Sequence, residues 1–484
     1  MTNPPNVRSA PQPAPASTPA QPPGAPGSGP APHPGTPPPG ARPAAGSPLR
    51  GALSGARTRL RTAATTEPGR LQIIGAVLAA LVVAFGTVTA FEVSGRASAA
   101  DDVVSRSQPL SADAASVYRS LADADTAASS GFLAGARNEP AEVRERYEKD
   151  IALASRLLVK AATNTDGSSE SGRQIATLNE QLPVYTGRIE TARSYNRQGL
   201  PLGGAYLRFA NEQMTKVLLP AAQKLYDAET ARLDRDDEDA RFWPVFSLLV
   251  GVLALGALFW AQRRNYRHTN RVFNHGMLAA TAASTVVLLW LVVAHTVAGA
   301  QLNEARTSGQ QSLKVLNDAR ISSLKARANE NLVLVARGAV LTDDGKNDKY
   351  ETEYGENMRD LGEGLSRAQR MADDGEGRDP VRAAATSVTT WQQKHQKVSE
   401  TDKSGDYEGA VRQVIGSKDS TGQSFDQVDA ALEKALAHEQ REFTRAAEDG
   451  RSALGGLPAG AAVLGVLGAL GAILGINRRL SEYR

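Results

Sequence analysis

The sequence contains no cysteine, and most of it is poor in proline. The lack of cysteine excludes a disulfide scaffold, thiolate metal ligands and cysteine catalysis, although it does not decide the compartment. Of the 26 prolines, 17 lie in residues 1–50, which also lack Asp and Glu. Such a segment buries too little apolar surface to offset its ordering entropy, so we predict a disordered Pro-rich tail over 1–70. The remaining chain is rich in Ala, Leu, Val, Arg and Glu, which favours helix.

Motifs for catalysis and metal binding are also missing. The sequence has no Gly-Lys-Ser/Thr phosphate loop, His-Glu-x-x-His zinc helix, Gly-x-Ser-x-Gly elbow or kinase motif set. No two of its six histidines are three or four residues apart. We therefore expect no enzymatic activity, no catalytic residue, no cofactor and no metal. His395 lies on an apolar helical stripe and is interpreted as a core histidine, and His295 as a neutral histidine near a membrane interface.

Four long apolar runs organise the chain: 71–91, 242–261, 277–300 and 457–476. Each has about twenty residues without Asp, Glu, Lys or Arg, which suffices for a helix to cross roughly 30 Å of hydrocarbon. In the second run, aromatic pairs at Phe242-Trp243 and Phe259-Trp260 lie where a membrane helix meets its two interfaces. We predict an all-α polytopic membrane protein with four transmembrane helices.

Basic residues predict the orientation of these helices. The net charge is +6 over residues 1–70, +4 over 262–275 and +2 over 477–484. Short Arg-rich flanks stay in the cytoplasm, which places both termini and the loop 262–276 inside. Segments 92–241 and 301–456 are then extracellular. Because the basic excess is explained by topology, we do not expect nucleic-acid binding.

The first apolar run has a second interpretation. Ala97-Ser98-Ala99 resembles a signal-peptidase site, which would make this run a cleaved signal peptide. A preceding tail of about 70 residues and a long apolar stretch fit an uncleaved signal anchor better, since signal peptides have a short basic start and a shorter apolar region.

The two extracellular segments are predicted to be copies of one another. The apolar stripe Val143, Tyr147, Ile151, Ala154 and Leu158 recurs 207 residues later as Tyr350, Tyr354, Met358, Leu361 and Leu365. A second stripe from Ile175 to Ala192 recurs 206 residues later from Val381 to Val398, and Gly199 and Gly203 fall on Gly405 and Gly409. Each copy reads as four helices separated by turn signals, typical of an up-down bundle. Breaks in the second copy are predicted at Asp343–Gly345, Asp373–Pro380 and Ser404-Gly405.

A family resemblance rests on the second copy. The segment Lys403-Ser404-Gly405-Asp406-Tyr407-Glu408-Gly409-Ala410, followed by the stripe Phe425, Val428, Leu432 and Leu436, resembles the four-helix-bundle sensor domains of bacterial chemoreceptors and histidine kinases. Two such bundles on four spans, after a Pro-rich tail, are similar to actinobacterial membrane proteins of the GlnX type, and this resemblance covers residues 71–484 as architecture. It implies a protein that links a secreted amino-acid-binding lipoprotein to a cytoplasmic Ser/Thr protein kinase.

Three sets of residues are candidate sites. Arg263, Arg264, Arg267 and Arg271, with His268, form a compact basic cluster that contacts anionic lipid or docks an acidic cytoplasmic partner. Thr62, Thr65 and Thr66 lie among arginines and are candidate phosphate acceptors. In the last span, Gly456, Gly460, Gly471 and Gly475 form two Gly-x-x-x-Gly pairs, which favour a close contact with another span or with a second copy in a homodimer.

The distribution of residues favours a sensor or adaptor. About 150 residues per copy lie outside, whereas the predicted inside segments have no room for an output domain. A receptor of this kind signals through a separate cytoplasmic effector, by small shifts of its membrane helices. The alternative is a structural or scaffolding protein of the cell envelope, whose bundles hold a partner without switching.

Overall fold

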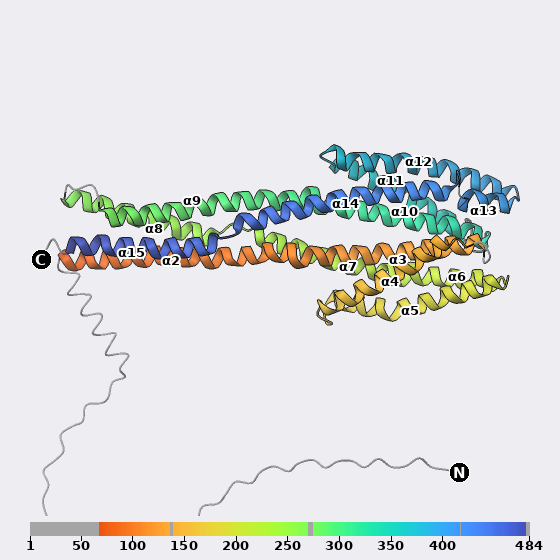
Figure 1. The fold of residues 1–484 in the computed structure, drawn as a ribbon, viewed down its shortest axis with the longest axis horizontal. Helices are drawn as coiled ribbons and strands as arrows, with labels where there is room; N and C mark the ends of the chain where they lie inside the picture. Colours follow the sequence, from red (N-terminus) through yellow and green to blue (C-terminus); the bar gives the residue numbers. More distant parts are fainter. Residues whose placement is uncertain (1–66, 136–138, 270–273, 417, 481–484) are drawn as a thin grey trace, which may run out of the picture. The chain divides into compact units, whose positions relative to one another are not determined.

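The described part of the protein is almost entirely helical. The computed structural model describes residues 67–135, 139–269, 274–416 and 418–480, shown in Figure 1. Within these ranges every regular element is a helix, apart from one isolated bridge between Leu341 and Asp348. The predicted all-α fold is confirmed. Most of the predicted Pro-rich tail, with Thr62, Thr65 and Thr66, lies outside the described residues.

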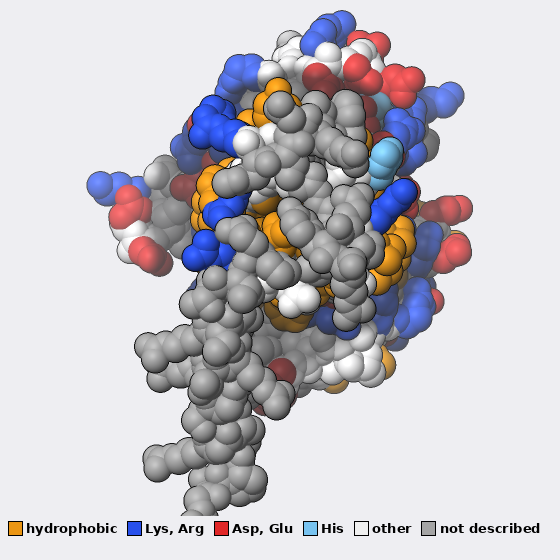
Figure 2. Space-filling model, turned by 90° about the vertical axis from the view of Figure 1, so that its left-hand side faces the viewer, with side chains coloured by type: hydrophobic (Ala, Val, Ile, Leu, Met, Phe, Trp, Pro, Cys, Tyr) orange, Lys and Arg blue, Asp and Glu red, His pale blue; other side chains and the backbone are white. Residues whose placement is uncertain are grey.

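Four helices are long and apolar enough to cross a membrane, as predicted. They include α2 (Glu67–Asp102), α8 (Val245–Thr269), α9 (His275–Glu304) and α15 (Leu457–Leu480). Their outward faces expose large apolar side chains such as Phe246, Leu249 and Leu474. Figure 2 looks along the long axis of the described part from the end at which these helices lie. It shows apolar side chains gathered near the centre and charged side chains further out. The protein is a multi-pass membrane protein.

Glycines bring α15 close to two other spans. A Cβ at Gly86 of α2 would lie 2.9 Å from Cα of Gly465, and one at Gly276 would lie 2.2 Å from the carbonyl oxygen of Gly471. Gly460 contacts Trp290, and Gly475 contacts Gly276 and Asn274. Within the described residues these glycines thus pack against other spans of the same chain. Gly456 differs from the prediction, because it has φ +77° in the turn before α15 and its Cβ would contact nothing.

Two helical bundles follow the spans. Bundle 1 contains α3 (Gln108–Ala134), α4 (Ala141–Thr163), α5 (Glu170–Arg197), α6 (Leu202–Gln213) and α7 (Leu219–Arg241), with the π-helical segment η2 (Met214–Leu218) between the last two. Bundle 2 contains α10 (Gln311–Ala336), α11 (Lys349–Met371), α12 (Gly375–Lys403), α13 (Tyr407–Ile415) and α14 (Thr421–Leu454). Figure 1 shows them side by side.

The matched apolar stripes face the cores of the bundles. Tyr147 and Tyr354 are both buried, as are Tyr185 and Trp391, whereas Val143 and Ile151 are half-buried. Gly199 and Gly405, at matched turns, adopt φ of +70° and +91°, a backbone conformation that glycine reaches without strain. The packing thus repeats between the bundles at the level of individual residues.

Bundle 2 also departs from the predicted breaks. Its fourth helix is interrupted between the end of α13 and the start of α14, where Asp419 has φ +52° and Ser420 caps α14 by accepting a hydrogen bond from the Gln423 N–H. Pro380 lies inside α12 rather than in a break. That helix begins at Gly375 because the Asp374 side chain caps it, accepting a hydrogen bond from the N–H of Gly377.

The two copies connect to their spans in the same way. Helix α2 continues into α3 through the π-helical η1 (Val103–Ser107), and α9 continues into α10 through η3 (Ala305–Gln310). The returning helices instead break at the span, between Arg241 and Val245 in the first copy and at Gly455-Gly456 in the second. Each copy therefore has one continuous and one jointed connection.

Candidate sensory site between the bundles

The bundles meet along α3 and α10, and buried polar contacts join them there. The Thr126 hydroxyl donates to the Leu324 carbonyl at 2.8 Å, and the Asn331 amide donates to Oγ of Ser129 at 3.0 Å. The core residues of both bundles form one continuous cluster. A displacement of either bundle must therefore disturb this contact.

Three adjoining cavities follow this contact, with volumes of 380, 510 and 340 Å³. Arg119, Arg320 and Glu433 line both of the first two, and Arg146 lines both the second and the third. We call this row of cavities the inter-bundle groove. Its walls come mainly from α3, α4 and α7 of bundle 1 and from α10 and α14 of bundle 2, so a ligand in it would touch both bundles.

Arg119 presents an unpaired positive charge to the groove. Its guanidinium donates to Oγ of Ser116 at 2.8 Å and to Oδ1 of Asn317, and no described carboxylate lies within ion-pair distance. Burial, together with the nearby charge of Arg320, lowers the pKa of Arg119 to about 10, so it stays protonated at neutral pH. A half-buried guanidinium without an acidic partner is a ready binding group for an anion.

Other charges of the groove are paired, both within each bundle and between the two bundles. Arg320 binds Asp429 through two hydrogen bonds of 2.7 and 3.0 Å within bundle 2. Arg146 of bundle 1 lies 2.7 Å from Asp123 and 3.6 Å from the same Asp429. Burial, followed by repulsion from Asp123, raises the pKa of the neighbouring Asp150 to about 8. The bundles are thus joined by an ionic network that a charged ligand would rearrange.

Each bundle also contains a buried carboxylate. Asp125 in bundle 1 accepts hydrogen bonds from Tyr185 at 3.1 Å and Asn211 at 2.7 Å, and burial raises its pKa to about 6. In bundle 2, Glu330 accepts from Arg327 at 2.5 Å and Trp391 at 3.1 Å.

His395 completes the network of bundle 2. Its Nδ1 lies 2.9 Å from Glu330, its Nε2 lies 3.2 Å from Glu351, and its ring stacks on Tyr354. Burial alone lowers the pKa of His395, but its bonds to these two glutamates outweigh burial and raise the pKa to about 9. His395 is therefore a buried, hydrogen-bonded histidine of the core.

A polar joint connects bundle 1 to the spans. The Arg96 guanidinium of α2 donates to the carbonyl oxygens of Phe242 at 2.5 Å and Trp243 at 3.0 Å, where α7 ends. From α9, His295 lies 3.2 Å from the Arg241 carbonyl, and its ring packs edge-on against Trp243. The predicted interfacial histidine thus contacts the break itself, where α7 turns into α8.

The predicted docking arginines lie on a helix rather than in a loop. Helix α8 extends to Thr269, so Arg263, Arg264 and Arg267 occupy its last turns. Arg263 and Arg267 are exposed, and Arg264 lies over the ring of Trp260 at 5.5 Å. Arg271 lies outside the described residues. One further group in the described chain, Asp374, His438 and Glu442, is arranged as metal ligands could be.

Sequence reasoning missed the groove. Its charged residues face away from the apolar stripes, which are the features that periodicity detects. A usable signal was present in α3, where Arg119, Asp123 and Asp125 interrupt a helix rich in Ala and Ser. Charges in such a setting need partners from outside the helix.

One comparison with known proteins is informative. Residues 99–238 match the family model described as an actinobacterial sensor domain. The match supports an actinobacterial sensor protein. It runs from the end of α2 through bundle 1 into α7, and it indicates a sensor or signalling role. No curated protein and no solved structure matches the chain.

Proposed function

We propose that this protein is a transmembrane sensor that relays the state of extracytoplasmic bundles to a separate cytoplasmic effector, without catalysing a reaction itself. One observation carries the proposal. The helices that line both sides of the inter-bundle groove, α3 and α10, are the two that continue into spans, through η1 and η3. A ligand that moves one against the other would displace α2 against α9, and helix shifts of this kind transmit signals across interfaces.

The external signal in this proposal carries an anionic group that pairs with Arg119. The ligand is a small molecule or is presented by a solute-binding lipoprotein, the partner that the family resemblance implies. Arg119 is the recognition residue because it has a full charge, faces two cavities and lacks an ion-pair partner among the described residues. The ion pairs of Arg146 and Arg320 with Asp429 would then reorganise around the bound anion.

The output surface in this proposal is the basic end of α8, with both termini in the cytoplasm. Arg263 and Arg267 are exposed there and would dock an acidic surface of the effector, for which a Ser/Thr protein kinase is the candidate. Thr62, Thr65 and Thr66 are candidate phosphate acceptors for such a kinase. The competing function, an envelope scaffold, needs neither the groove nor this surface to change state.

The output is tested by recovering cytoplasmic partners from membranes with the full chain as bait. Arg263, Arg264 and Arg267 are replaced together by Gln, and we expect partner recovery to fall at least about tenfold, as loss of a few charge-assisted contacts would produce. The matched control replaces three exposed bundle arginines, Arg173, Arg359 and Arg382, by Gln, which changes the net charge equally. Unaltered recovery in the first variant, with topology verified, contradicts this output surface.

The input is tested by reversing the charge in the groove. Arg119→Glu places a carboxylate beside Asp123 and Glu433, so it should separate the bundles and change partner recovery. Arg173→Glu makes the same charge change on an exposed face of α5 and should leave recovery unchanged. Recovery that is the same in both variants and in the unaltered chain would favour the scaffold.

A further inference from the structure

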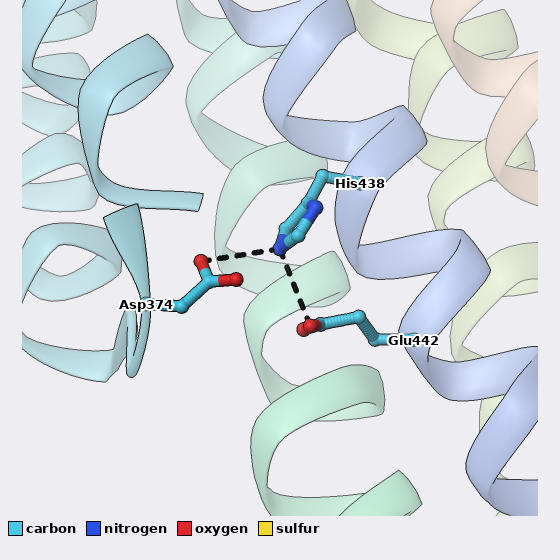
Figure 3. A group of neighbouring side chains, drawn as sticks. All are labelled: Asp374, His438 and Glu442. Carbon is cyan, nitrogen blue, oxygen red and sulfur yellow. Dashed lines mark ion pairs between the residues drawn. The ribbon is translucent and has the colours of Figure 1, made fainter. Parts of the chain in front are cut away.

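We propose that Asp374, His438 and Glu442 form a binding site for a divalent transition-metal ion, with Zn²⁺ as the ion that the ligand set fits. The site lies in bundle 2, where the start of α12 meets the middle of α14 (Figure 3). His438 and Glu442 stand one helical turn apart on α14, and Asp374 is the residue that caps α12. All three side chains point toward one another in Figure 3.

A buried nitrogen without a hydrogen bond points into this site. His438 is only 6% exposed, and its Nε2 has no access to solvent and no hydrogen-bond partner. This atom lies 3.3 Å from Oδ1 of Asp374 and 3.4 Å from Oε1 of Glu442, in positions that give neither carboxylate a well-aligned bond. Leaving such a nitrogen unsatisfied is costly, and a metal ion between the three groups would satisfy it.

The distances agree with tetrahedral coordination. Zinc binds histidine nitrogen and carboxylate oxygen at about 2.1 Å, so neighbouring ligand atoms of a tetrahedral site are about 3.4 Å apart. The two distances from Nε2 of His438, 3.3 and 3.4 Å, match this edge length. The ligand atoms of all three residues lie within 4.8 Å of one another. A three-ligand site of this kind leaves the fourth position to water.

The surroundings hold the ligands as metal sites require. Nδ1 of His438 lies 3.5 Å from a carboxylate oxygen of Glu376, and a carboxylate on the second nitrogen of a metal-bound histidine fixes its tautomer. Asp374 is held by the N–H of Gly377 at 2.7 Å. A Cβ at Gly377 would lie 3.3 Å from the His438 ring and 3.4 Å from Oδ1 of Asp374, so glycine leaves both ligands unobstructed.

A metal here would clamp α12 to α14, the helix of bundle 2 that returns to the membrane. It would tie the first turn of α12 to α14, and α14 leads through Gly455-Gly456 directly into the span α15. Metal occupancy would therefore stabilise bundle 2 at the helix that returns to the membrane. This inference does not depend on the groove or on a cytoplasmic partner, and its test measures neither.

The test uses the full chain in detergent, stripped with a chelator and dialysed against ZnCl₂. We expect one tightly held Zn²⁺ per chain by elemental analysis, and a rise of several degrees in the unfolding temperature that MgCl₂ does not reproduce. His438→Gln, Asp374→Asn and Glu442→Gln should each weaken Zn²⁺ binding by at least about tenfold and remove the thermal shift. Asp374→Asn keeps a good helix cap, so it separates metal binding from folding.

The matched control is Asp348→Asn. Asp348 caps α11 as Asp374 caps α12, accepting a hydrogen bond from the N–H of Glu351, and it is not part of the site. This variant should bind Zn²⁺ as the unaltered chain does. The site is refuted if the unaltered chain holds no Zn²⁺ after dialysis, or if Asp374→Asn and Glu442→Gln bind it as tightly as Asp348→Asn.

Discussion

Tyr185 and Trp391 occupy matched positions, 206 residues apart, and each donates a hydrogen bond to a buried carboxylate on the first helix of its own bundle. Tyr185 donates to Asp125 at 3.1 Å, and Nε1 of Trp391 donates to Glu330 at 3.1 Å. Both aromatic side chains are fully buried. The repeat therefore preserves an aromatic donor and a buried acid, although the chemical identity of both residues differs.

The two acids differ in the groups that stabilise their negative charge. Asp125 has only neutral hydrogen-bond donors, Tyr185 and Asn211, and burial raises its pKa to about 6. Glu330 has the cations Arg327 and His395, and although burial raises its pKa, the bond from His395 and the charge of Arg327 hold it below its usual value. At neutral pH the first acid is ionised at a cost, whereas the second is ionised and paired.

Replacing Asp125 by Asn should stabilise the protein at neutral pH. The pKa of Asp125 is raised from 3.8 to about 6 in the folded state, so its contribution to stability is present below about pH 4 and is lost as the pH rises through 6. The loss is about 3 kcal/mol at pH 7. Unfolding of the full chain by urea at pH 5 and pH 7.5 should show a smaller difference in stability for Asp125→Asn than for the unaltered chain.

Two comparisons keep this prediction specific. Lys325 and Glu353 line the cavity beside Asp125, and Asp150 titrates at higher pH, so only the difference between variant and unaltered chain isolates Asp125. Asp166→Asn, at an exposed carboxylate of the α4–α5 turn, is the control and should leave stability at both pH values nearly unchanged. An Asp125 variant with the full pH dependence of the unaltered chain would show that folding does not raise the pKa of this acid.

His395→Gln should destabilise bundle 2 by about 3 kcal/mol near pH 7, because it removes a cation from the buried Glu330. The pKa of His395 is raised from 6.5 to about 9, so its stabilising effect is complete below about pH 6.5 and is lost as the pH rises through 9. Unfolding measured between pH 6.5 and 9.5 should therefore slope less in the variant. Lys397→Gln, exposed on the same helix, controls for a lost charge and should retain the slope.

The sequence predicted most of the helical packing, because core contacts within a bundle repeat at helical spacing. That spacing placed Tyr354 on one apolar stripe and Trp391 and His395 on the stripe of the next helix, and in the fold the ring of Tyr354 packs against both. Spacing does not predict which bundle faces meet. The contact between Arg146 and Asp429, and the groove that these residues line, therefore could not be predicted from spacing.

The proposed metal ligands also could not be predicted from spacing, because they come from two helices. A search for paired histidines overlooks a site with one histidine and two carboxylates, although His438 and Glu442 stand at the spacing of one helical turn. Asp374 comes from the start of a different helix and reaches the site through packing of α12 on α14. The predicted break Asp373–Pro380 was also too long, since the side chain of Asp374 caps α12 and the helix begins at Gly375, before Pro380.

Close packing of α15 against α2 should not tolerate a side chain at Gly86. A Cβ there would lie 2.9 Å from Cα of Gly465 and 3.0 Å from the carbonyl oxygen of Ala461, both backbone atoms that cannot move aside. Gly86→Val should destabilise the spans by about 1–3 kcal/mol or more, measured as a lower unfolding temperature in detergent. Gly256→Val in α8 is the matched control, because a Cβ at Gly256 would contact nothing. Equal effects in the two variants would contradict this interface.

The orientation of the spans can be tested directly, because the chain has no cysteine and each introduced thiol is the only one present. Ser168 lies in the exposed α4–α5 turn and Ser366 on the exposed face of α11, whereas Ser54 belongs to the basic N-terminal segment. Since Arg-rich flanks stay in the cytoplasm, Ser168→Cys and Ser366→Cys should react with a membrane-impermeant thiol reagent in intact cells. Ser54→Cys should react only after lysis, which also shows that the intact cells are sealed. The reverse pattern would place the bundles and the inter-bundle groove in the cytoplasm, and a groove in that position could not receive an external ligand.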